Sequence, residues 1–183
     1  MRDELKHFDW HVYGLQIGDF SATLGLVEEI ISSRDDQLQR QISETVVYDE
    51  KGEKLNNDHD GVNEVLDDLR YYKWIDDFFI YHFGLWRLQG IFEGMLRQEF
   101  FPDKELNGLK KKLDTVIGMG YSIDNKDYLE ILEWGRLRNA LSHFPPEKYR
   151  AVGLTRDDLC DYRSLVERTI KDLVGQREKK NMR

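Results

Sequence analysis

Residues 62–101 read VNEVLDDLRYYKWIDDFFIYHFGLWRLQGIFEGMLRQEFF, and they contain the longest regular pattern in the sequence. Its apolar side chains recur every three or four residues, which is the spacing of one face of an α-helix. The residues that keep this spacing are Val65, Leu66, Leu69, Tyr72, Ile75, Phe79, Phe83, Leu88, Phe92 and Leu96. The pattern predicts one long helix from about Val62 to Phe101. Gly84, Gly90 and Gly94 each weaken it by about 1 kcal/mol relative to alanine, so we expect another backbone to pack closely against them.

Similar patterns predict shorter helices on either side of this one. The predicted ranges are 19–42, 104–119, 125–143 and 157–174, with caps at Asp103, at Asp124 or Asn125, and at Thr155. Pro145-Pro146 ends the third of these ranges. Thr45-Val46-Val47-Tyr48 is typical of a short strand, and the turn-forming residues 49–52 would let it pair with Glu53-Lys54-Leu55. We therefore expect a small β-hairpin between the first two helices.

These elements predict an all-α fold, an antiparallel helical bundle with a small β-hairpin insertion. Residues 1–60 would form an amino-terminal helix plus hairpin appendage, residues 61–176 the helical core, and residues 177–183 a basic, frayed tail. The whole would be one compact domain, because 183 residues and 21.8 kDa match one domain of ordinary size.

Composition excludes several classes of protein. Hydrophobic residues make up 40% of the chain and charged residues 34%, which excludes a disordered chain and a membrane-embedded one. No apolar run approaches the roughly 20 residues of a membrane-spanning helix, and residues 1–6 show no signal-peptide pattern. Cys160 is the single cysteine, so the sequence predicts neither a disulfide framework nor a multi-cysteine zinc site, and it fits a reducing cytoplasm.

Charge is distributed unevenly along the chain. The net charge is −8, which argues against a protein that coats nucleic acid without specificity. Residues 136–183 hold 12 basic and 7 acidic residues, a local balance of +5. This last quarter would suit a polyanion, although a basic tail that only promotes solubility has the same composition.

The stretch 134–146, WGRLRNALSHFPP, carries the candidate chemistry. On a helix, Arg138 lies about 40° from Trp134 and about 60° from Leu141, so it projects beside the apolar face. A guanidinium in that position needs an anion, either a carboxylate of the fold or a bound phosphate. Pro145 ends the helix near His143, which frees the imidazole to approach Arg138. The carboxyl end of the helix favours the histidine cation and Arg138 opposes it, so His143 would titrate near neutral pH.

At these residues the chain resembles the HEPN superfamily, small helical-bundle proteins common among prokaryotic toxins, abortive-infection proteins and RNA-processing enzymes. Their signature is an Arg, four to six further residues, and a His, often with a polar residue directly after the Arg. Arg138, Asn139 and His143 fit it, at the end of a late helix. The resemblance covers residues 62–174. Some HEPN toxins carry a modifiable tyrosine two residues after the His, where this chain has Pro145.

The resemblance implies a metal-independent endoribonuclease of defence, toxin or stress control, in which an RNA 2′-hydroxyl attacks the adjacent phosphate. His143 would act as acid or base, Arg138 would bind the phosphate, and Asn139 would orient either group. Arg136 and Ser142 would contact substrate. No cofactor or metal is implied. RNA, a second copy of the chain and a neutralising partner protein are the expected partners, and no membrane is. The alternative is a non-catalytic module that binds RNA or a protein, in which Arg138 and His143 are a structural pair.

Other candidates are weaker. Glu93 precedes Arg97 by four residues, which fits a surface ion pair, and otherwise it is an acidic partner for Arg138. His7 and His11 have metal-ligand spacing but lack an evident third ligand. Residues 56–67 echo a calcium loop but fit ordinary helix capping better. The aromatic residues at 78–86 are expected in the core and at a dimer face.

Overall fold

The chain folds into five α-helices in the computed structural model, which describes residues 14–46, 48, 50–53, 59–104, 106–142 and 153–182. The helices are α1 (Gly18–Thr45), α2 (His59–Phe100), α3 (Leu109–Gly118), α4 (Asn125–Ser142) and α5 (Arg156–Asn181). The prediction of an all-α bundle is thereby confirmed. None of the helices in the described ranges is long and apolar enough to cross a membrane.

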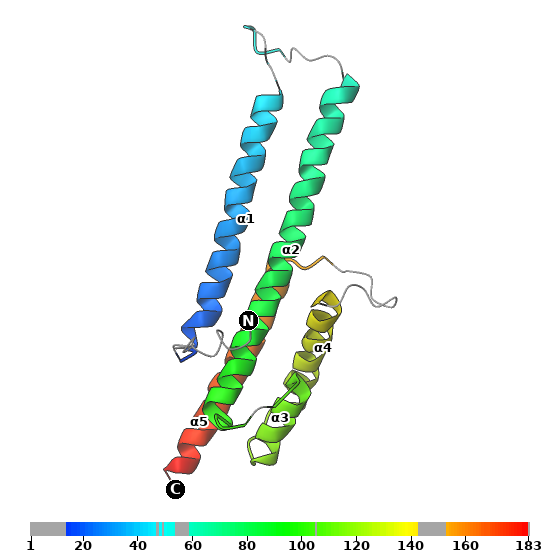
Figure 1. Cartoon of the computed structure of the whole chain (residues 1–183). Helices are drawn as coiled ribbons and strands as arrows, with labels where there is room; N and C mark the ends of the chain where they lie inside the picture. The colour runs from blue at the N-terminus through cyan, green and yellow to red at the C-terminus, as the bar shows by residue number, and fades with distance from the viewer. Residues whose placement is uncertain are drawn as a thin grey trace, which may run out of the picture.

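Two long helices set the shape of the molecule. α2 has 42 residues, which at 1.5 Å per residue is about 63 Å. It runs antiparallel to α1, and the pair extends well beyond the other three helices (Figure 1). α3, α4 and α5 cover only the half of α2 that leads to Phe100, as the same view shows. We call the uncovered part of the α1–α2 pair, residues 32–45 of α1 and 59–79 of α2, the arm.

The core lies where α5 meets α1 and α2. Phe20, Leu24 and Val27 of α1 are buried against the second half of α2, and every buried apolar residue of α5 belongs to the same cluster. Gly84 lets these helices approach one another, because an added Cβ would lie 2.6 Å from Leu159 Cδ1 and 3.0 Å from Val27 Cγ2. The first half of α1 is therefore part of the core rather than of an appendage.

The apolar spacing of α2 continues past the core into solvent. Leu66, Leu88, Phe92 and Leu96 are buried as the pattern suggests. Val65, Tyr72, Phe79 and Phe83 are instead between 46% and 63% exposed. A helical period identifies one face of a helix, but it does not say whether a neighbouring helix covers that face.

Capping chemistry explains two helix starts. Thr155 and Asp158 form a reciprocal capping box at α5, as predicted, with Asp158 Oδ2 accepting from Thr155 N at 2.7 Å. Asp124 Oδ1 accepts from Lys126 N at 2.8 Å and caps α4.

Two predicted boundaries differ from the structure. α3 begins at Leu109 rather than Lys104, because Gly108 takes a φ of 89° that a helix does not tolerate. α5 continues to Asn181 rather than ending near Val174, so residues 177–181 are helical and not a frayed tail. Lys180 Nζ explains the extension, since it donates to the carbonyls of Met119 and Gly120 at the end of α3.

The predicted hairpin is not supported by the described residues. Thr45, expected to begin the first strand, is the last residue of α1, and no described residue lies in a strand. Tyr48 makes an isolated bridge, and a turn follows it at residues 50–52. Val47, Asp49 and residues 54–58 lie outside the described residues.

Candidate functional site

Arg138 projects from α4 toward α2, beside the core. Its side chain is 25% exposed, and Nη2 lies 3.3 Å from Glu93 Oε1. Its Nη1 donates to Asn139 Oδ1 at 3.0 Å. The largely buried guanidinium therefore pairs with an anion, and that anion is the side-chain carboxylate of Glu93.

Glu93 joins three helices at this point. Its carboxylate is 13% exposed and accepts from Lys112 Nζ of α3 at 2.5 Å. It also accepts from Gln89 Nε2, one turn earlier on α2, at 2.7 Å. The carboxylate thus pairs with Arg138 and Lys112 rather than with Arg97. One carboxylate therefore pairs with cations from two other helices.

A cleft of about 410 Å³ opens in front of this cluster. Its lining comes from α2, α4 and the start of α3, and consists of Gln89, Glu93, Gly108, Leu109, Lys110, Leu132, Gly135, Arg136, Arg138 and Asn139. Gly135 allows α4 and Leu109 to lie close together at the base of the cleft, because a Cβ there would lie 2.7 Å from Leu109 Cδ2. The volume falls in the range of roughly 300 to 1,000 Å³ that is usual for small-molecule sites.

The amino-terminal end of α3 forms one wall of the cleft. Gly108 occupies its N-cap position and provides no side-chain cap, and its first turn carries no acidic residue. The first backbone N–H groups of a helix have no partner within the helix and carry part of its positive dipole. Arg138, Arg136 and Lys110 add cationic side chains to this wall, and they pair with Glu93, Glu133 and Asp114 respectively. An anion is the ligand that this wall suits best.

Buried polar atoms around Arg138 add to this picture. Gln89 Oε1, Tyr162 Oη and His82 Nε2 are buried and make no hydrogen bond within the described part of the chain. Burial raises the pKa of the Tyr162 phenol, the Glu93 charge raises it further and Arg138 opposes the shift, so the phenol stays neutral. Unsatisfied buried polar groups cost free energy and are uncommon. Three such atoms close to Arg138 indicate a region that suits a polar ligand.

The remaining predicted site residues lie around the carboxyl-terminal half of α4. Asn139 is exposed on the cleft wall and bonded to Arg138. Arg136 is also exposed on the rim, where it pairs with Glu133. Ser142 is the last residue of α4, but its side chain lies outside the described residues, as do His143, His7, His11 and residues 56–58. The described part of α4 runs to Ser142, and the predicted end of this helix near His143 lies outside the described residues.

Lys112, Gln89 and Tyr162 belong to the site but were not found by sequence reasoning. They lie on three helices, and nothing in their local spacing separates them from ordinary surface or core residues. The uncapped start of α3 at Leu109 was not predicted, because the sequence pattern placed the start of this helix at Lys104. The sequence did contain one indication of this start, since Gly108 directly precedes a strongly amphipathic segment and has no side chain that could cap a helix.

Within the described ranges, no three His, Cys, Asp or Glu side chains gather as a metal site would require.

Comparison of the chain with protein-family models, curated proteins and solved structures found no match.

Proposed function

We propose that this protein is a metal-independent endoribonuclease of the HEPN type, acting in the cytoplasm in defence, toxin or stress control. The observation that carries the proposal is the meeting of Arg138 with the uncapped start of α3 in one cleft. Guanidinium groups and helix N-termini both bind phosphate, and here they share a cavity large enough for a nucleotide phosphate and its sugar.

Each residue of the motif has a role in this proposal. Arg138 and the α3 backbone hold the scissile phosphate and the charge that develops on it. Asn139, bonded to Arg138, fixes the guanidinium. Arg136 and Ser142 contact the flanking RNA backbone. His143 removes the proton from the attacking 2′-hydroxyl or gives one to the leaving 5′-oxygen. A second copy of the chain would supply the other proton-transfer group.

A non-catalytic RNA- or protein-binding module is the second candidate. The contact between Glu93 and Arg138 favours it, because a carboxylate already occupies one edge of the guanidinium. In the enzyme, the phosphate binds in the cleft beside this ion pair, between Arg138 and the start of α3. In the binding module, the ion pair between Glu93 and Arg138 only stabilises the fold.

The deciding experiment incubates the purified chain with mixed RNA in EDTA. We expect cleavage that leaves 2′,3′-cyclic phosphate ends, because the attacking group belongs to the RNA. His143→Ala should lose about 10² to 10⁴-fold in rate without losing RNA affinity. Arg138→Ala should lose both rate and affinity. Arg168→Ala is the matched control, because Arg168 is exposed on α5 and pairs with Asp127.

Three results would count against the enzyme. Equal cleavage by wild type and His143→Ala means a contaminating nuclease. Absence of cleavage, combined with weaker RNA binding by Arg138→Ala, identifies the binding module. RNA affinity that does not fall with added salt contradicts any phosphate-centred site, because phosphate contacts release counterions. A neutralising partner protein would be expected to cover this cleft.

A further inference from the structure

A second, smaller pocket lies on the other side of Arg138. It has a volume of about 240 Å³ and is lined by His82, Phe83, Trp86, Arg138 and Leu141. Because Arg138 also lines the cleft, the two hollows adjoin through this side chain. The volume lies below the usual range for whole ligands, so the pocket suits a single ring system.

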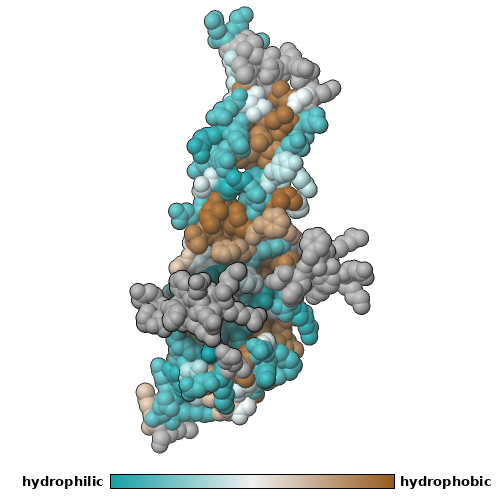
Figure 2. Space-filling model, viewed as in Figure 1, coloured by the Kyte–Doolittle hydropathy of each residue, from teal (hydrophilic) through white to brown (hydrophobic). Residues whose placement is uncertain are grey.

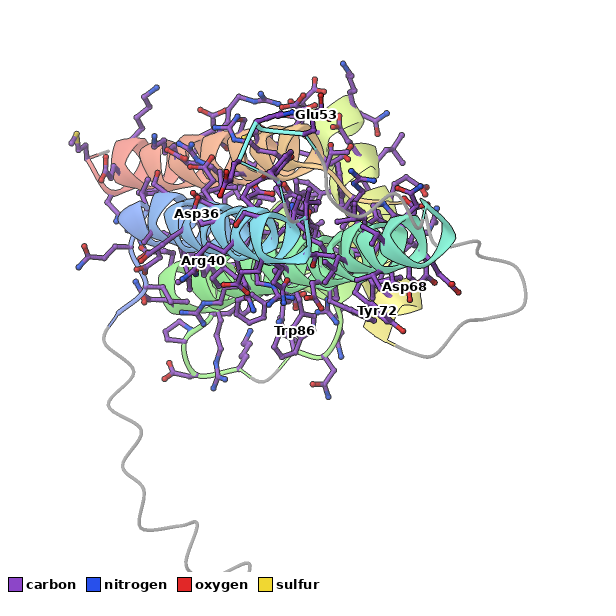
Figure 3. The ribbon with its side chains drawn as sticks, turned by 90° about the horizontal axis from the view of Figure 1, so that it is seen from above. Asp36, Arg40, Glu53, Asp68, Tyr72 and Trp86 are labelled. Atoms are coloured by element: carbon purple, nitrogen blue, oxygen red, sulfur yellow. The ribbon has the colours of Figure 1, made fainter. Side chains whose placement is uncertain are left out.

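The walls of this pocket are aromatic and exposed. Trp86 is 54% exposed and Phe83 46% exposed, although both are large apolar side chains on an otherwise well-packed segment of α2. Trp86 projects from the side of α2 that faces away from α5 (Figure 3). Aromatic rings and an arginine plane are the surfaces on which nucleobases stack, with about 1 to 3 kcal/mol per base.

His82 supplies a polar group in the same pocket. Its ring packs edge-on against Phe78 with centroids 3.8 Å apart, which fixes the imidazole plane. Burial lowers the pKa of His82, so the ring is neutral at pH 7 and has one donor and one acceptor nitrogen. Its buried Nε2 makes no hydrogen bond to any described residue. A ligand that supplied this bond would remove the cost of an unsatisfied polar atom.

We infer that this pocket binds the nucleobase next to the phosphate held in the cleft, with the base stacked on Trp86 and Phe83 and its edge hydrogen-bonded to His82. The inference rests on the proposed function in one respect, namely that the anion in the cleft is an RNA phosphate. It adds a base subsite, and therefore a source of sequence preference, to a site whose other contacts address the backbone.

The test compares equilibrium binding of three probes to the full chain: uridine 3′-monophosphate, adenosine 3′-monophosphate and inorganic phosphate. None of them can be cleaved, so binding is measured apart from catalysis. Trp86→Ala should weaken nucleotide binding by about 5- to 100-fold and leave phosphate binding unchanged. Trp86→Phe should retain most of the affinity. Trp74→Ala is the matched control, because Trp74 is 56% exposed on the same helix and lies outside the pocket.

His82→Phe tests the edge contact. We expect it to reduce the difference in affinity between the two nucleotides while both still bind, because stacking remains.

The outcomes separate the subsite from the proposed function. If Arg138→Ala weakens phosphate binding but Trp86→Ala leaves nucleotide binding unchanged, the base subsite is wrong and the phosphate site stands. If the wild type binds none of the probes, both are wrong. If Trp74→Ala weakens nucleotide binding as much as Trp86→Ala does, the aromatic surface acts as a whole and the pocket has no special role. If Trp86→Ala instead halves the mass measured by light scattering, this surface is a contact between two copies and the subsite is overturned.

Discussion

Glu93 determines how much positive charge the cleft presents. It lies between Arg138 and Lys112, and all three side chains are at most 25% exposed. Charges in such a setting are weakly screened by solvent. The residue therefore contributes to the fold, because it joins α2, α3 and α4, and it opposes the binding of any anion.

Glu93→Gln should separate these two effects. The glutamine keeps the shape but leaves two cations without their anion, so the free energy of unfolding should fall by about 1 to 3 kcal/mol. RNA binding should become tighter by roughly tenfold, since a nearby charge at a protein surface is worth on the order of 1 to 4 kcal/mol. Urea denaturation and RNA titration measure the two quantities.

Glu133→Gln is the control for this substitution, because Glu133 is 63% exposed and pairs with Arg136 on the rim. It should change stability little. If Glu93→Gln weakened RNA binding, Glu93 would be part of the binding machinery and its assignment as an opposing charge would be wrong.

The glycines of α2 have different surroundings at the level of the helix. We expected another backbone to pack closely at all three, but the close neighbours are side chains, and they are present at two of the three glycines. Gly84 faces Leu159 and Val27, and a Cβ on Gly94 would lie 2.4 Å from Leu15 Cδ1. Gly90 has no atom within 4 Å of an added Cβ. The neighbours are side chains, so these sites report helix packing rather than contact between backbones.

Gly84→Ala and Gly90→Ala should therefore have opposite effects on the midpoint of thermal unfolding. Alanine at position 84 overlaps Leu159 and should cost about 1 to 3 kcal/mol. At position 90 it should stabilise the helix by up to about 1 kcal/mol. Equal effects of the two substitutions would contradict the packing of α5 against α1 and α2.

The end of α5 contacts the last turn of α2 and the turn that follows α3. Arg177 Nη1 donates to the Glu99 carbonyl at 2.9 Å and pairs with its carboxylate at 2.7 Å. Lys180 Nζ lies 4.2 Å from the centroid of the Tyr121 ring and caps the end of α3. Basic residues here are structural contacts, which a count of charges along the sequence does not reveal.

Arg177→Ala and Lys180→Ala should each lower stability by about 0.5 to 1.5 kcal/mol, or a few degrees in Tm. Lys179→Ala is the control, because Lys179 is an exposed basic residue on the same turn of α5. A frayed tail would show no difference among the three variants by calorimetry.

The arm is the main feature of the whole molecule. Its α2 helix carries Val65, Tyr72 and Phe79 seven residues apart, each between 47% and 63% exposed. Figure 2 shows apolar surface between polar side chains along the part of the molecule formed by α1 and α2. A seven-residue apolar repeat is the pattern by which one helix packs against another. A second copy of the chain is the partner we expect there.

Light scattering at tens of micromolar should therefore give twice the chain mass of 21.8 kDa. The double variant Tyr72→Glu/Phe79→Glu should be monomeric, because charges do not tolerate burial at an interface. Tyr48→Glu serves as the control, since Tyr48 is 61% exposed but lies outside α2. A wild-type mass near 21.8 kDa would rule out the dimer.

Local sequence signals predicted the five helices, several of their boundaries and one functional candidate. Apolar spacing located α2, and Thr155 and Asp124 located the starts of α5 and α4, because these signals act within a few residues. The position of Arg138 beside an apolar face also predicted that it needs an anion. These inferences depend only on local geometry.

The identity of that anion and the position of the cleft follow from the packing of the helices. Glu93 is 45 residues from Arg138 and Lys112 is 19 residues from Glu93, and no local rule links residues at such separations. The exposure of the first half of α2 could not be predicted from the sequence either. Helical periodicity is the same on a covered and an uncovered face, and only the lengths and positions of α4 and α5 show that they leave this half uncovered. Packing between helices, rather than the pattern within one, fixes both.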